Sequence, residues 1–91
     1  MLGNKRYRIQ YLSMVVERDI PLLPKTMKIM IKTAIEERLM VDPISFGKPL
    51  RYSLKGHRRL RVGDYRIVYR INQNTMTVLV TAIKHRKDIY E

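Results

Sequence analysis

The stretch that decides the fold is RRLRVGDYRIVYR, residues 58–70, in which two strand-like segments surround a Gly-Asp pair. Glycine supplies the positive φ that a tight hairpin needs, so Gly63-Asp64 predicts a turn between strands at residues 57–62 and 65–71. Alternate side chains of a strand point to opposite faces of the sheet. The second strand therefore has an apolar face of Tyr65, Ile67, Tyr69 and Ile71, and its other face carries Arg66, Val68 and Arg70.

The segments around this hairpin predict a small α+β fold. Residues 7–12 alternate like a strand, and residues 76–84 form an apolar, β-branched strand. Helical spacing of apolar residues predicts helices at 14–20 and 24–40, with Asp42-Pro43 ending the second one and a loop at 46–50. The expected order is β-α-α-β-β-β: an antiparallel-dominated sheet with two N-terminal helices packed on one face and the other face open. Residues 1–91 are expected to form a single domain.

The charge of the chain is strongly positive. Nineteen Lys and Arg stand against eight Asp and Glu, a net charge of +11, and most of the excess falls in residues 46–91. This asymmetry favours a polyanionic partner over a merely solvated surface. The chain has no cysteine, no signal peptide pattern and no apolar run long enough to span a bilayer, which favours the cytoplasm and no membrane partner.

Several kinds of site are excluded by composition. The glycines lie too far apart for a phosphate loop, and two histidines without cysteine give no ordinary zinc spacing. Carboxylates are scarce after Asp42, which disfavours a two-metal nuclease or a paired-carboxylate hydrolase. We therefore expect no metal and no small-molecule cofactor.

A cluster of Arg, His and Tyr remains as the candidate site. Arg59 and Arg61 share one strand face, and the hairpin can bring Arg66 beside them. Such a repulsive cluster is explained if an anion binds there, and the planar guanidinium suits phosphate. The C-terminal segment adds His85, Arg86 and Tyr90. The alternative is a solvated edge strand whose charges prevent aggregation.

Three blocks of the sequence resemble the RelE branch of the RelE/ParE toxin superfamily. They are GKPLR at 47–51, RLRVGDYRIVY at 59–69 and HRKDIY at 85–90, and together the likeness spans almost the whole chain. The resemblance implies a type II toxin and metal-independent endoribonuclease that cleaves messenger RNA on the ribosome and is neutralised by a RelB-like antitoxin. The implied chemistry is attack of a ribose 2′-hydroxyl on the adjacent phosphate.

The family motifs carry the implied site onto Arg59, Arg61, Arg66, His85, Arg86 and Tyr90. Arg59 and Arg61 stand where some members have lysines. Arginine stays protonated and is a poor general base, so His85, with the ordinary histidine pKa of about 6.5, is the better candidate for proton transfer.

Two other functions stay open at the level of sequence. A ParE-like toxin that inhibits DNA gyrase would share the fold. A non-catalytic module that binds RNA or an antitoxin would share the basic face.

Overall fold

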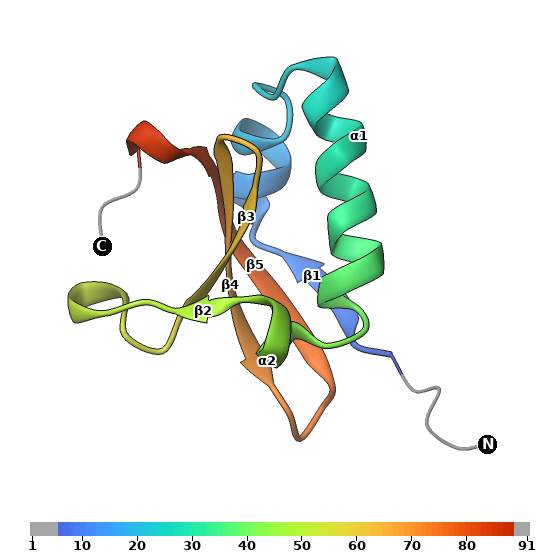
Figure 1. Ribbon diagram of the computed structural model, residues 1–91, viewed down its shortest axis with the longest axis vertical. Coiled ribbons are helices and arrows are strands. Elements are labelled where there is room, and N and C mark those ends of the chain that lie inside the picture. The colour runs from blue at the N-terminus through green and yellow to red at the C-terminus, as the bar shows by residue number, and fades with distance from the viewer. Residues whose placement is uncertain (1–5, 89–91) are drawn as a thin grey trace.

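Five strands form one sheet in the computed structural model, which describes residues 6–88 (Figure 1). The strands are β1 (Arg8–Tyr11), β2 (Lys48–Pro49), β3 (Arg58–Val62), β4 (Tyr65–Asn72) and β5 (Thr77–His85). They lie in the order β1-β5-β4-β3-β2, with β1 parallel to β5 and the other neighbours antiparallel. The predicted antiparallel-dominated sheet is therefore confirmed, but β2 lies within the segment 46–50 that was expected to be a loop, so the expected order β-α-α-β-β-β lacks one strand. The helices carry the chain from β1 at one edge to β2 at the other.

The two predicted helices are present. The first is η1 (Val15–Asp19), a π-helical segment, and the second is α1 (Lys25–Ala34), which continues as the π-helical η2 (Ile35–Leu39). Two 3₁₀ turns, η3 (Tyr52–Leu54) and η4 (Arg86–Asp88), lie before β3 and after β5.

A third helix, α2 (Pro43–Phe46), was not predicted. The Asp42-Pro43 pair was expected to end the preceding helix, but that helix ends at Leu39 and the pair begins α2 instead. The Asp42 carboxylate accepts a hydrogen bond from the Ser45 N–H at 3.1 Å, as a helix N-cap does. Hydrogen bonds from Ser45 lower the pKa of Asp42. Pro43 takes the first helical position, where a missing N–H is harmless.

The helices cover one face of the sheet, here called the inner face (Figure 1). Ile31, Ala34, Ile35 and Leu39 are buried on the helical side of this core, against Leu60, Ile67, Val78 and Val80 of the sheet. Burial of one aliphatic side chain contributes about 1.5–3 kcal/mol. The opposite side of the sheet, here called the outer face, carries the even-numbered residues of β4, beginning with Arg66.

A close approach between Gly47 and Tyr69 fixes the segment that leads from α2 into β2. The Tyr69 side chain is fully buried, and its hydroxyl donates a hydrogen bond to the Pro43 carbonyl at 2.6 Å. Burial raises the pKa of Tyr69. A Cβ at position 47 would lie 1.7 Å from the Tyr69 Oη, so only glycine fits.

We expect Gly47→Ala to destabilise the protein by about 2 kcal/mol, because the added methyl group overpacks the site. Tyr69→Phe should cost about 1–2 kcal/mol, because the Pro43 carbonyl loses its donor. In the double variant the loss should be about 1 kcal/mol smaller than the sum, since the clashing hydroxyl is gone. Urea unfolding measures all three. Tyr52→Phe, at an exposed tyrosine, is the matched control, and strictly additive losses would contradict the contact.

Candidate nucleic-acid interface

The β3–β4 hairpin brings three arginines together on the outer face. Arg61 is directly opposite Arg66, and Arg59 is opposite Val68, two residues further along each strand. The turn between the strands depends on Gly63, whose φ is +59°. Arg59, Arg61 and Arg66, here called the arginine cluster, therefore share one face as the alternation of the sequence indicates.

Both neighbouring strands also place a lysine beside the arginine cluster. Lys48 of β2 is opposite Arg59, and Lys84 of β5 is opposite Arg66. Side chains directly opposite each other in an antiparallel pair lie about 4.5–5.5 Å apart at Cβ, and like charges there are destabilising. A bound anion would relieve this repulsion.

Arg66 is the most buried member of the arginine cluster, with 9% of its surface exposed. Burial lowers the pKa of its guanidinium, and the positive charges of Arg61, Arg59 and Arg86 lower it further. Its Nη1 donates to the Tyr65 carbonyl at 3.3 Å. Within residues 6–88, no carboxylate lies within ion-pair distance of Arg61 or Arg66. The site therefore holds concentrated positive charge in a partly dehydrated setting, which strengthens its interaction with a phosphate.

Asp19 neutralises the lysine of this surface, and sequence reasoning missed it. Its carboxylate is buried at the end of η1, where it accepts a hydrogen bond from the Ile83 N–H at 2.9 Å and from the Lys84 Nζ at 2.7 Å. Asp19 thus supplies a hydrogen-bond acceptor to the part of β5 that continues beyond its pairing with β1. The contact joins residues far apart in the chain, and no local pattern marks it.

His85 lies on the inner face, across the sheet from the arginine cluster. It is paired with Tyr65, and the two rings meet edge to face with centroids 5.3 Å apart. The His85 Nδ1 accepts a hydrogen bond from the Lys87 N–H at 3.2 Å, so a neutral ring carries its proton on Nε2. The structure does not bring this ring to the arginines, and its role in proton transfer stays a prediction.

Arg86 lies beside the hairpin turn. Its backbone N–H donates to the Asp64 carbonyl at 2.8 Å, and its Nε is 3.8 Å from the Asp64 carboxylate. Both side chains are mostly exposed, so this ion pair contributes little to stability. Tyr90, the last predicted site residue, lies outside the described residues.

The other two arginines of the opening stretch do not belong to the arginine cluster. The Arg58 side chain donates through Nη2 to the carbonyls of Ile44 and Gly47, so it completes the C-terminal end of α2. Arg70 lies on the outer face, further along β4, opposite Leu79 of β5. The sheet register thus brings together three of the five arginines of residues 58–70.

Residues 6–88 contain no group of three His, Cys, Asp or Glu side chains that could hold a metal ion. No helix in this part of the chain is long and apolar enough to cross a membrane.

Comparison with known proteins gives consistent matches. The family profile described as the ParE toxin of the type II toxin–antitoxin system parDE matches residues 16–90. The chain is 37% identical to Toxin RelG of Mycobacterium tuberculosis over 73 residues, 80% of this chain and 84% of that protein. The crystal structure of the RelBE2 toxin–antitoxin complex from the same organism matches with a TM-score of 0.83 at 30% identity, over 93% of this chain and 97% of that one.

The isolated RelE toxin of Escherichia coli matches with a TM-score of 0.71 over 87% of this chain and 83% of that one, at 17% identity, which shows a shared fold alone. The profile defines the class as a type II toxin, and the chain belongs to the RelE branch of the RelE/ParE toxin superfamily.

We expect Arg66→Met to stabilise the fold by about 1 kcal/mol, because it removes a buried charge that faces like charges. The gain should shrink at high salt, which screens the repulsion in the unmodified protein. Arg70→Met, on the same strand but opposite a leucine, should change stability by less than about 0.5 kcal/mol. Urea unfolding at low and high salt measures both variants, and a loss of stability in Arg66→Met at low salt would contradict this account.

Proposed function

We propose that this protein is a ribosome-dependent endoribonuclease that cleaves messenger RNA during translation. The observation that carries the proposal is the arginine cluster, in which Arg61 and Arg66 are paired directly across the hairpin. RNA is the polyanion that the implied chemistry requires, and this chain is similar to the toxins RelG and RelE of Mycobacterium tuberculosis. The place of action would be the cytoplasm, where messenger RNA is translated.

The proposed reaction is an internal transfer at phosphorus. The ribose 2′-oxygen attacks the adjacent phosphate, the bond to the 5′-oxygen of the next nucleotide breaks, and a cyclic phosphate and a 5′-hydroxyl result. The 2′-hydroxyl gives its proton to a base, and the leaving 5′-oxygen takes up a proton. Arginines near the phosphate would stabilise the negative charge that develops on it.

Each predicted site residue has a role in this proposal. Arg66, which is buried and held by the Tyr65 carbonyl, would contact the reacting phosphate. Arg59 and Arg61 would bind the same phosphate or its neighbours, and Arg86 would add charge near the turn. In the neutral ring of His85, Nδ1 accepts the Lys87 N–H and Nε2 carries the proton, so this residue would act as the acid only as the imidazolium and as the base only after a change of tautomer. Tyr90 would stack on a base.

A cognate antitoxin of the RelB type is the proposed protein partner. The similar solved structures include complexes of RelE with RelB from Pyrococcus horikoshii, Escherichia coli and Methanococcus jannaschii. This chain exposes large apolar side chains on its helices, among them Ile29 and Met30 of α1 and Phe46 of α2. An amphipathic antitoxin segment with acidic residues would fit such a basic, partly apolar surface.

Induced expression of the protein without antitoxin should stop growth and produce messenger RNA cut at defined positions within translated frames. Arg66→Ala should reduce cleavage on programmed ribosomes about 100-fold or more, and Tyr90→Ala should also impair it. Lys25→Gln, which removes an exposed charge from α1, is the matched control and should cut normally. Intact messenger RNA with the unmodified protein would contradict the proposal.

Protein that has been treated with EDTA and then freed of the chelator should cleave as fast as untreated protein, because the proposal assigns charge stabilisation to arginines and not to a metal ion held by the protein. The measurement is the rate of cleavage of messenger RNA on washed ribosomes in magnesium buffer, which keeps the ribosomes assembled. Untreated protein taken through the same buffer exchange is the control. A loss of activity after chelation that an added transition metal restores would contradict metal independence.

A second candidate function is inhibition of DNA gyrase. The matching family profile is described by the parDE system, and the fold does not separate the two activities. A supercoiling assay distinguishes them, because a gyrase inhibitor would block supercoiling and leave messenger RNA uncut. A protein that binds RNA but gives neither effect would be a non-catalytic binding module.

A further inference from the structure

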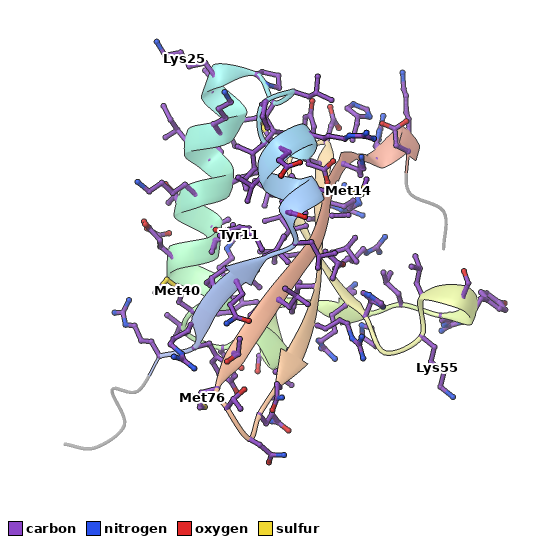
Figure 2. All side chains as sticks on the ribbon, turned by 180° about the vertical axis from the view of Figure 1, so that it is seen from behind. Tyr11, Met14, Lys25, Met40, Lys55 and Met76 are labelled. Carbon is purple, nitrogen blue, oxygen red and sulfur yellow. The ribbon has the colours of Figure 1, made fainter. Side chains whose placement is uncertain are left out.

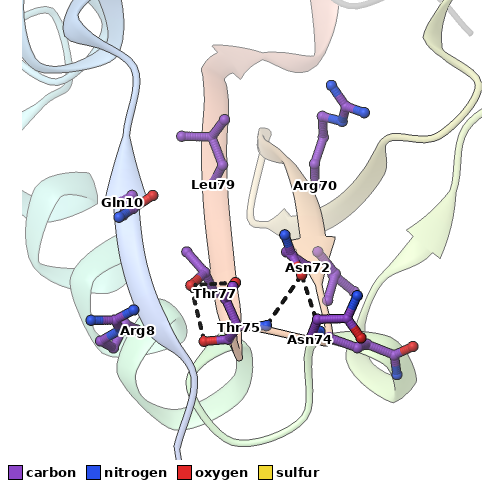
Figure 3. Close-up of a pocket in the computed structure, with 10 residues that line it drawn as sticks. Arg8, Gln10, Arg70, Asn72, Asn74, Thr75, Thr77 and Leu79 are labelled. Carbon is purple, nitrogen blue, oxygen red and sulfur yellow. Dashed lines mark hydrogen bonds between the residues drawn. The ribbon is translucent and has the colours of Figure 1, made fainter.

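The outer face contains a polar hollow at the end of the sheet that lies away from the arginine cluster (Figure 3). It has a volume of about 680 Å³ and lies over β1, β5 and the β4–β5 hairpin. Arg70, four residues beyond Arg66 on β4, lines it. At the rise of an antiparallel strand, the hollow begins roughly 13 Å from Arg66 on the same face.

The lining of the hollow is cationic and rich in carboxamides. Arg8 and Arg70 bring positive charge, Gln10 and Asn72 bring carboxamides, and the lining contains no acidic side chain. Gln10 is paired with Leu79 on β5, and Leu79 is paired with Arg70 on β4, so the three side chains form one row across the sheet. Leu79, which is half-buried, is the apolar member of this row and lies between Gln10 and Arg70.

The groups of the hollow remain available to a ligand. Within residues 6–88, Arg8, Gln10 and Arg70 have no hydrogen-bond or ion-pair partner among their side-chain atoms. Asn72 uses only its oxygen, which accepts from the N–H groups of Asn74 at 3.0 Å and Thr75 at 3.2 Å. Figure 3 shows its amide nitrogen turned away from these bonds, where it can donate to a ligand.

We propose that this hollow is a second subsite for the RNA substrate. It binds one nucleotide of the RNA at a short distance along the RNA chain from the phosphate that is cut. Carboxamides pair with base edges through one donor and one acceptor. Guanidinium groups bind phosphate and stack on bases. Gln10 and Asn72 select the base, Leu79 supports it, and Arg8 and Arg70 hold the flanking phosphates. The inference rests on the proposed function and adds a source of sequence preference to it.

Two matched substitutions test the subsite. Gln10→Ala removes one carboxamide, and Arg70→Gln removes one charge without altering the hairpin turn that Asn72 holds. Arg70→Gln should weaken binding of a short labelled single-stranded RNA of mixed sequence about tenfold in fluorescence anisotropy. The slope of log K against log salt should fall in magnitude by about 0.7, as expected for the loss of one phosphate contact. Gln10→Ala should relax the base preference at one position of the mapped cleavage sites.

Lys25→Gln is the control for charge. Lys25 is the first residue of α1 and lies far from Met76, which marks the β4–β5 hairpin beside the hollow (Figure 2). It should leave affinity, salt slope and cleavage pattern unchanged. A thermal unfolding midpoint within a few degrees of the unmodified protein shows that each variant is folded.

The outcomes separate the subsite from the proposed function. Failure of the unmodified protein to cut messenger RNA would overturn the proposed function. The effect of Arg70→Gln on affinity for the short RNA would still test whether the hollow binds RNA. If the unmodified protein cuts, but both variants keep its RNA affinity and its cleavage pattern, the subsite is overturned. Loss of ribosome binding alone, with unchanged affinity for the short RNA and unchanged cut positions, would assign the hollow to ribosomal RNA and overturn its assignment to the substrate.

Discussion

The pairing of Arg61 with Arg66 is the constraint on which the outer face of this protein depends. The turn at Gly63 sets the register of β3 and β4, and a slip by one residue would turn the arginines into the core. Burial of Leu60, Val62 and Ile67 opposes such a slip. Each of these side chains contributes about 1.5–3 kcal/mol, whereas repulsion in a like-charged cross-strand pair is about 1 kcal/mol or less. Burial of apolar side chains on the inner face therefore outweighs the repulsion between the arginines on the outer face.

Most of the fold could be predicted from periodicity, because strands and helices of this length repeat their apolar pattern several times. The short helix α2 could not, since four residues carry no period and a residue before proline is more typical of a helix end. A start signal is nevertheless present, because Asp42 is a favourable N-cap residue and Pro43 suits the first helical position. The parallel pairing of β1 with β5 was also beyond local reasoning, because it is set by packing between the two ends of the chain.

The candidate site was predictable to the extent that strand alternation determines it. Two-residue spacing placed Arg59 with Arg61, and the hairpin added Arg66. The same alternation could have shown that His85 shares the inner face with Ile83, because the two residues are also two apart on β5. The partners of Arg58 and Lys84 could not be predicted, since they are carbonyls of α2 and a carboxylate of η1 that only the tertiary fold brings near.

In the proposed reaction, the division of the sheet into an inner and an outer face would also separate two chemical tasks. The arginine cluster supplies positive charge that persists at any physiological pH, so it can bind and stabilise a phosphate but cannot accept a proton. Lys84, the lysine opposite Arg66, is committed to Asp19. A proton acceptor for the proposed reaction would therefore lie outside the arginine cluster and Lys84. In the proposed reaction, phosphate binding would follow from the sheet register, whereas proton transfer would need a group that this register does not place in the arginine cluster.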